Sequence, residues 1–403
     1  MLYTTKNLYG GKIMKRKIIL TSVLFAMLLT ACNKNSQTAQ TEQNISTAAE
    51  TLTVTENTET EQTEDTSISE TETSAEEQSE PELILPENMK LFDVSKLNGG
   101  YSGFGFLKGS IYREILKDRV NFYDINTQTL EATIDLPAGS KSFEKTDDSC
   151  LCKICVWSKE NDSDQVITIY NDYTYETADY ALENISFRVC GHNIAEEGYD
   201  IIDTDKNVKI LEGGIWRNSE NYGYKFLFEI DENRFVYQKY GNIYSLGFGI
   251  YDFETGSDIF ISDTVWHTPF GFHDGKIYSM YCIEDDHASK FPDGVYGDIY
   301  VTDIETGKMQ HGFDCPLSDS DYIRYEYAMP ENGEFIALLA TPYELETYAF
   351  CIIDPDTGGI IREYDVLCRK EIICRSIWFA DNDTAVITDR SGGNKLIIAD
   401  LNL

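Results

Sequence analysis

The sequence predicts an all-β fold, a β-propeller of four-stranded antiparallel blades. A polar turn, Asp-Phe-Glu-Thr-Gly, begins at Asp252, and similar turns begin at Asp303, Asp354 and Asp400. A polar turn that ends in Gly between β-prone runs is a hairpin signal. These Asp residues lie 51, 51 and 46 residues apart, which is too long for one hairpin but fits a four-stranded blade.

A second recurring turn indicates that each repeat holds two hairpins. It lies upstream of each Asp turn, for example as Asp231-Glu232-Asn233, His273-Asp274-Gly275 and Glu331-Asn332-Gly333. The runs between the turns are short and carry no helical period, which favours antiparallel strands. The strands expected in the fifth repeat are 270–272, 277–282, 299–303 and 309–313.

The two ends of the repeat region predict a closed ring. The last repeat stops after its third strand, 395–400, and the segment 89–94 precedes the first full repeat without a hairpin partner. Because an open sheet edge is a liability, we expect 89–94 to supply the missing fourth strand. We expect seven blades, although the 32 residues between Asn171 and Asp203 leave six or eight open.

This ring closure resembles the propeller superfamily, which includes quinoprotein-like and WD-repeat proteins. The resemblance covers residues 89–403 and is architectural. No Trp-Asp dipeptide is present, and the tryptophan motifs of quinoprotein alcohol dehydrogenases are missing. The resemblance therefore implies a fold and no activity.

The N-terminal residues predict a lipid anchor. Three basic residues, 15–17, precede the apolar run 18–29, which has the proportions of a signal peptide and is too short for a stable bilayer anchor. Leu29-Thr30-Ala31-Cys32 then resembles the lipobox of bacterial lipoproteins, in which the cysteine is lipidated. We expect residues 1–31 to be a lipoprotein signal peptide, with Met14 as an alternative start.

Residues 32–80 are predicted to be a disordered tether rich in Ser, Thr and Glu. They hold almost no large apolar side chains, so they cannot offset the entropy of ordering. As a flexible coil, the tether reaches about 40 Å on average. It would hold a propeller domain, residues 81–403, off a membrane on the extracellular or periplasmic side.

The charge of the chain limits its partners. The formal net charge is −36, and 57 acidic side chains stand against 27 basic ones in residues 81–403. An acidic surface excludes nucleic acid as a partner and favours solubility and cationic partners. We expect the protein to be a monomer.

No motif for catalysis, a metal or a cofactor stands out. The five histidines lack the H-E-x-x-H spacing of zinc hydrolases. The pair Cys152 and Cys155 has the spacing of a redox or metal motif, but we interpret it as structural, because a strand directs these two thiols to opposite faces. Cys282, Cys351 and Cys374 are interpreted as core residues.

We expect a ligand to bind on one particular face of the propeller. On this face lie the loops that join one blade to the next and the loops that join the second strand of a blade to the third. An insert in the fifth repeat is longer than a tight turn requires, and long loops are often functional. The neighbouring connections bring in aromatic side chains, which could stack on sugar rings or hold a cation. The candidate ligand-binding residues are Trp216, Tyr222, Trp266, His267, Asp285, Asp286 and His287.

These features predict a lipid-anchored binding or scaffold module for a glycan, peptide or protein. The alternative is a propeller-fold hydrolase or lyase acting on carbohydrate. A glycosidase needs two carboxylates at a fixed separation. The sequence nominates no such pair among the many acidic side chains of the domain.

Overall fold

The computed structural model describes residues 85–98, 104–144, 148–157, 164–215, 221–241, 245–261, 266–282, 295–318, 322–342, 347–367, 374–389 and 395–402. The chain divides into two units, Met1–Glu82 and Leu83–Leu403, and all of these residues lie in the second. The predicted signal peptide, Cys32 and the predicted tether lie outside the described residues. No helix in the described part of the chain has both the length and the apolar character needed to cross a membrane.

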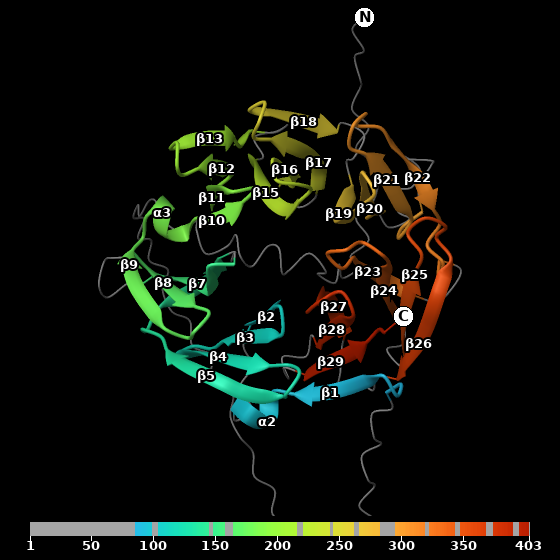
Figure 1. The fold of residues 1–403 in the computed structure, drawn as a ribbon, viewed down its shortest axis with the longest axis horizontal. Coiled ribbons are helices and arrows are strands. Elements are labelled where there is room, and N and C mark those ends of the chain that lie inside the picture. Colours follow the sequence, from blue (N-terminus) through green and yellow to red (C-terminus); the bar gives the residue numbers. More distant parts are fainter. Residues whose placement is uncertain are drawn as a thin grey trace, which may run out of the picture. The chain divides into compact units, whose positions relative to one another are not determined.

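The described residues form seven antiparallel sheets that follow one another around a common centre, as the blades of a β-propeller (Figure 1). This confirms the predicted fold and its blade number. Six sheets have four strands, and the fourth has an additional short strand at its inner edge. That additional strand was not predicted.

Blade one consists of β2 (Phe104–Lys108), β3 (Ile111–Ile115), β4 (Arg119–Asp124) and β5 (Thr129–Asp135). Blade two consists of β6 (Ser140–Glu144), β7 (Cys150–Trp157), β8 (Asp164–Tyr170) and β9 (Tyr175–Asp179). Blade three consists of β10 (Phe187–Val189), β11 (His192–Glu197), β12 (Asp200–Asp203) and β13 (Val208–Leu211). Blade four consists of β14 (Gly214–Ile215), β15 (Asn221–Glu229), β16 (Arg234–Gly241), β17 (Ser245–Asp252) and β18 (Ser257–Ile261).

Blade five consists of β19 (His267–His273), β20 (Lys276–Tyr281), β21 (Ile299–Asp303) and β22 (Met309–Phe313). Blade six consists of β23 (Tyr322–Ala328), β24 (Ile336–Pro342), β25 (Thr347–Ile353) and β26 (Ile360–Leu367). Blade seven consists of β27 (Cys374–Phe379), β28 (Thr384–Asp389), β29 (Lys395–Asp400) and β1 (Met89–Asp93). Two short helices, α2 (Ser95–Asn98) and α3 (Leu182–Ile185), lie in connections.

Blade seven closes the ring with strands from both ends of the domain. Strand β1 pairs antiparallel with β29, from Met89 opposite Ala399 to Asp93 opposite Lys395. Figure 1 shows β1 in blue beside β29 in red. The predicted closure is confirmed, and it removes the open edge that β29 would otherwise present.

The recurring Asp turns join the third and fourth strands of the blades. Asp252 Oδ1 accepts a hydrogen bond from the Glu254 amide at 2.8 Å, and Asp354 Oδ1 accepts one from the Asp356 amide at 2.8 Å. The residue four positions after the Asp has a positive φ in five blades, namely Gln128 (58°), Asn207 (52°), Gly256 (63°), Gly307 (63°) and Gly358 (71°). Glycine accepts this conformation most readily, and the irregular copies keep the same turn without it.

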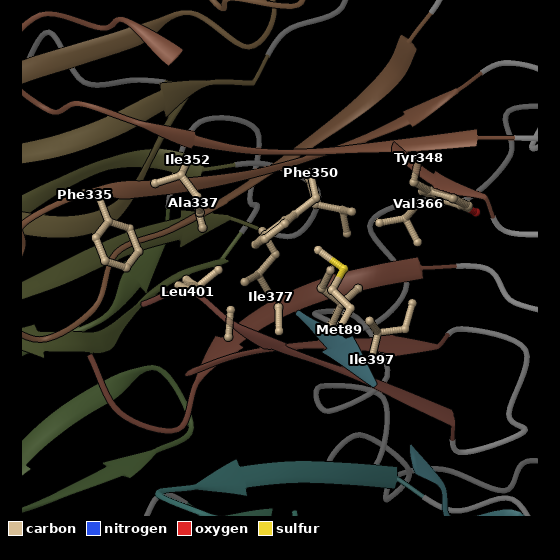
Figure 2. Packing of buried hydrophobic residues seen from close by; sticks show 14 residues of the cluster. Met89, Phe335, Ala337, Tyr348, Phe350, Ile352, Val366, Ile377, Ile397 and Leu401 are labelled. Carbon is tan, nitrogen blue, oxygen red and sulfur yellow. The ribbon is translucent and has the colours of Figure 1, made fainter. Parts of the chain in front are cut away.

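Adjacent blades pack against each other through apolar side chains, and the described residues form one such core at each of the seven junctions. The core between blades six and seven includes Met89 of β1, which lies among Phe350, Ile377 and Ile397 (Figure 2). Successive side chains of a strand point to opposite faces of its sheet, so each strand can contribute to two cores. Phe92 accordingly lies in the core between blades seven and one.

The described cysteines form no disulfide, and the pair on β7 packs in these cores, as predicted. Cys152 lies between blades one and two, whereas Cys155 lies between blades two and three. Cys351 is also buried, and Cys282 is half-buried. The side chain of Cys374 lies outside the described residues.

Candidate functional site

Blade five carries the most unusual group of side chains at one face of the propeller, which we call the upper face. At this face β19 and β21 begin and β20 ends. Backbone hydrogen bonds extend the ladder beyond the strands, from the Cys282 amide to the Trp266 carbonyl (2.9 Å) and from the Tyr281 amide to the Asp298 carbonyl (2.9 Å). These bonds hold Trp266, Tyr281 and Asp298 on neighbouring chain segments.

Four aromatic side chains of this region, Trp266, His267, Tyr281 and Tyr300, pack together and are here called the aromatic cluster. The His267 ring meets Tyr300 edge-on at 4.5 Å between centroids and lies 5.3 Å from Tyr281. Trp266 is half-buried and packs against the two tyrosines. His267 stands opposite Tyr281 in the β19–β20 register, which explains their contact.

Two polar atoms inside the aromatic cluster are buried without a hydrogen-bond partner among the described residues, namely His267 Nδ1 and Tyr281 Oη. His267 is only 4% exposed. Burial lowers the pKa of His267 to about 4, so the imidazole is neutral at physiological pH, and burial raises the pKa of Tyr281. The site therefore offers two neutral hydrogen-bonding groups.

Trp266 has a strained backbone, with a φ of 72°. This left-handed conformation costs an L-residue other than Gly about 1–2 kcal/mol. Such strain collects at binding sites and switch regions. The strained residue and the two unpartnered atoms thus lie within one aromatic cluster.

A hydrogen bond connects blade four to this site. The predicted Tyr222 also lies in blade four, but away from this hydrogen bond. Ser245 Oγ donates a hydrogen bond to the His267 carbonyl at 3.2 Å. Tyr222 lies on β15 rather than in the connection where the sequence suggested it. Lys239 Nζ lies 4.2 Å from the centre of the Tyr222 ring and 5.0 Å from that of Phe260. A ligand on this face of Tyr222 would compete with the Lys239 ammonium group.

The structure thus brings Trp266 and His267 together in the aromatic cluster. It places Tyr222 in blade four, where the Lys239 ammonium group lies over its ring. Trp216, Asp285, Asp286 and His287 lie outside the described residues. Lys239, Tyr281 and Tyr300 were not predicted as site residues. Tyr281 and Tyr300 resemble ordinary strand residues in the sequence, and only the pairing of the strands shows their contacts with His267.

A cluster that could hold a metal ion also lies in blade five, at the upper ends of β21 and β22. It comprises Asp298, His311 and Asp314, whose ligand atoms all lie within 4.8 Å of one another. The His311 ring meets Tyr300 edge-on at 5.2 Å, so it adjoins the aromatic cluster. The spacing His311-x-x-Asp314 is visible in the sequence. Asp298 joins it only through the pairing of β21 with β22.

The thiol in this region is not an activated nucleophile. Cys282 Sγ donates a hydrogen bond to Thr268 Oγ1 at 3.2 Å, and burial raises the pKa of Cys282 to about 11. Nucleophilic attack by cysteine requires the thiolate, which is favoured by a lowered pKa. The Cys282 thiol therefore lacks the lowered pKa that covalent catalysis by cysteine needs.

Comparisons with known proteins find distant likenesses among solved structures. No protein-family model matches the chain, and no curated protein matches it. The solved structures that resemble it include the β-propeller domain of Myceliophteria thermophila Cps50 (Swd1), at 11% identity and a TM-score of 0.41, covering 74% of this chain and 96% of that one. Kluyvelomyces marxianus Hsv2 matches at 10% identity and a TM-score of 0.45, covering 75% and 100%.

Kuenenia stuttgartiensis hydrazine synthase is similar to the same extent, with 12% identity, a TM-score of 0.43, and 74% of this chain and 96% of that one covered. The first of these three structures is described as a β-propeller domain. Propellers host many functions, so the likeness does not assign one to this chain.

Proposed function

We propose that this protein is a lipid-anchored, extracytoplasmic glycan-binding module. In this proposal Cys32 carries the lipid, residues 33–80 form the tether, and the aromatic cluster of blade five recognises the ligand. The observation that carries the proposal is the burial of His267 Nδ1 and Tyr281 Oη without a hydrogen-bond partner among the described residues, beside the strained and half-buried Trp266.

The chemistry of the aromatic cluster favours a neutral, hydroxyl-rich ligand. A buried polar atom without a partner costs about 1–3 kcal/mol, which a ligand hydroxyl can recover by pairing with it. The neutral imidazole has one donor and one acceptor nitrogen, and the phenol can donate or accept. An aromatic ring beside such groups can stack on the apolar face of a sugar.

A neighbouring side chain would have to move for a ligand to reach these atoms, because both are buried, and Trp266 is half-buried and packs against Tyr281 and Tyr300. The left-handed backbone at Trp266 supplies part of the driving force, since leaving that conformation relieves strain. We therefore propose that Trp266 covers the site in the free protein and contacts the sugar in the complex.

A glycan screen tests the proposal. The full chain carrying Cys32→Ser, which lacks the lipid, is screened on a glycan array and against chromogenic glycosides, and hits are measured by calorimetry. We expect saturable binding without turnover, and Trp266→Ala should weaken it about 10-fold to 100-fold. Trp378→Ala is the matched control, because Trp378 is exposed on β27 of blade seven.

Three results would reject parts of the proposal. Turnover of a glycoside would favour the hydrolase alternative. A Trp266→Ala variant that melts many degrees lower but keeps its affinity would show that Trp266 is a packing residue only. Binding of peptides but not of glycans would show that the proposed ligand class, glycans, is wrong.

A further inference from the structure

The residues Asp298, His311 and Asp314 of blade five form a cluster with one nitrogen and two oxygen ligand atoms. His311 Nε2 lies 3.2 Å from Asp314 Oδ1 and 3.6 Å from Asp298 Oδ2. His311 is on β22, Asp314 follows that strand directly, and Asp298 directly precedes β21. Strand pairing therefore fixes the positions of all three backbones.

Asp298 is a buried carboxylate with no lysine or arginine paired to it in the part of the chain that the structure describes. It is 3% exposed, and it accepts hydrogen bonds from the Cys315 amide at 3.1 Å and the Val295 amide at 3.0 Å. A buried charge is costly unless it is paired or coordinates a metal, so a cation beside the Asp298 carboxylate would add to the stabilisation that these two amides provide.

A second buried aspartate in the same chain shows how such a charge is usually compensated. Asp203 is 1% exposed and lies 3.9 Å from His192 Nδ1, as Asp298 lies beside His311. Lys206 Nζ, however, is 3.0 Å from Asp203 Oδ2 and supplies a permanent positive charge. Asp298 has the histidine without the lysine, and Asp314 adds a further negative charge.

Two of the three separations in the cluster are close to those between the ligands of a tetrahedral ion. Two ligands at about 2.0–2.2 Å from zinc lie about 3.3–3.6 Å apart. The distances of 3.2 and 3.6 Å from His311 Nε2 to the two carboxylate oxygens are close to this range, and the oxygens of Asp298 and Asp314 lie within 4.8 Å of each other. The amide hydrogen bonds to both oxygens orient the Asp298 carboxylate, and the edge-on contact with Tyr300 orients the His311 ring. Such supporting contacts are typical of metal sites.

We propose that Asp298, His311 and Asp314 bind a divalent cation of the zinc class at the upper end of blade five. One imidazole and two carboxylates suit zinc better than calcium, which prefers six to eight oxygen ligands. Three protein ligands leave a fourth position for water. The ion would tie the end of β22 to the start of β21. This inference does not depend on the proposed glycan binding.

Calorimetry with zinc chloride on the metal-stripped full chain carrying Cys32→Ser tests the site, with calcium chloride in parallel. We expect one zinc ion per chain and weaker calcium binding. His311→Gln and Asp314→Asn should each weaken zinc binding at least about 10-fold. Asp314 is 83% exposed, so Asp314→Asn should fold normally. Zinc at about 100 times its dissociation constant should raise the melting temperature by about 4 °C in the parent and less in the variants.

His192→Gln is the matched control, because it removes a histidine beside a buried aspartate that Lys206 already pairs. It should leave zinc affinity unchanged. The proposal is overturned if the parent binds no zinc. It is equally overturned if both blade-five variants bind zinc as tightly as the parent, since the free thiols would then be the ligands. A weakening by His192→Gln equal to that by His311→Gln would also contradict it.

Discussion

Truncating buried side chains of β1 tests the closure of the ring and has a magnitude that follows from the structure. Met89 and Phe92 are 5% and 3% exposed and lie in different cores, between blades six and seven and between blades seven and one. Replacing a buried Met or Phe by Ala costs about 2–5 kcal/mol, through lost burial and the cavity that remains. Lys90, between them on the strand, is exposed.

For a domain that spans residues 83–403, the entropy of unfolding is about 0.7 kcal/mol per kelvin. A loss of about 3 kcal/mol therefore lowers the melting temperature by about 4 °C. We expect Met89→Ala and Phe92→Ala each to show this shift. The double variant should be nearly additive, because the two side chains share no core.

Calorimetric melting and urea unfolding of the parent, the two variants and Lys90→Ala provide the measurement. Lys90→Ala should change the free energy of unfolding by less than about 0.5 kcal/mol. If Met89→Ala and Phe92→Ala melted within about 1 °C of Lys90→Ala, β1 would not be packed in the ring in solution.

The remaining predictions concern the anchor, a turn and a buried histidine. Cys32→Ser should move the protein from the detergent phase to the aqueous phase of a detergent partition, and a parent that is already aqueous would refute lipidation. Asp354→Ala should cost about 1 kcal/mol by removing the acceptor of two turn amides, whereas the exposed Asp356→Ala should cost little. The pKa of His267 is lowered to about 4, below its unfolded value near 6.5. The contribution of the neutral, buried imidazole to the free energy of unfolding is therefore complete above pH 6.5, and it is lost as the pH falls towards 4, because the unfolded chain takes up the proton first. Urea unfolding across this range should show a shallower pH dependence in His267→Gln than in the parent, and His273→Gln serves as the control.

The local chemistry of the turns made much of the fold predictable. An Asp side chain that accepts amide hydrogen bonds, followed by a Gly with positive φ, defines a hairpin without reference to the rest of the chain, as at Asp252 and Asp354. The regular spacing of these turns then predicted four strands per repeat. The unpaired segments at 89–94 and 395–400 predicted the closure, because an open edge needs a partner.

The irregular blades were harder to predict because their turns lack the usual residues. Asn207 and Gln128 adopt the positive φ that Gly256 adopts in blade four. The turn is therefore kept, although the Gly that would indicate it in the sequence is missing. Blade three also has short strands, including the four-residue β12 and β13, which explains the short spacing that left the blade number open. The two-residue β14 pairs with β15 and has no periodicity to detect.

The sequence by itself determined the turns, the four-strand plan of the repeats and the need for a closing strand, because these depend on residues close together in the chain. Tertiary structure alone decided that His267 is buried against Tyr281 and Tyr300, and that Asp298 lies beside His311 and Asp314. Burial and metal-ligand distances depend on which strands pair and which blades adjoin. A strand residue with the same local sequence can face a core, a neighbouring carboxylate or solvent. Which of these surroundings it has depends on how the sheets pack.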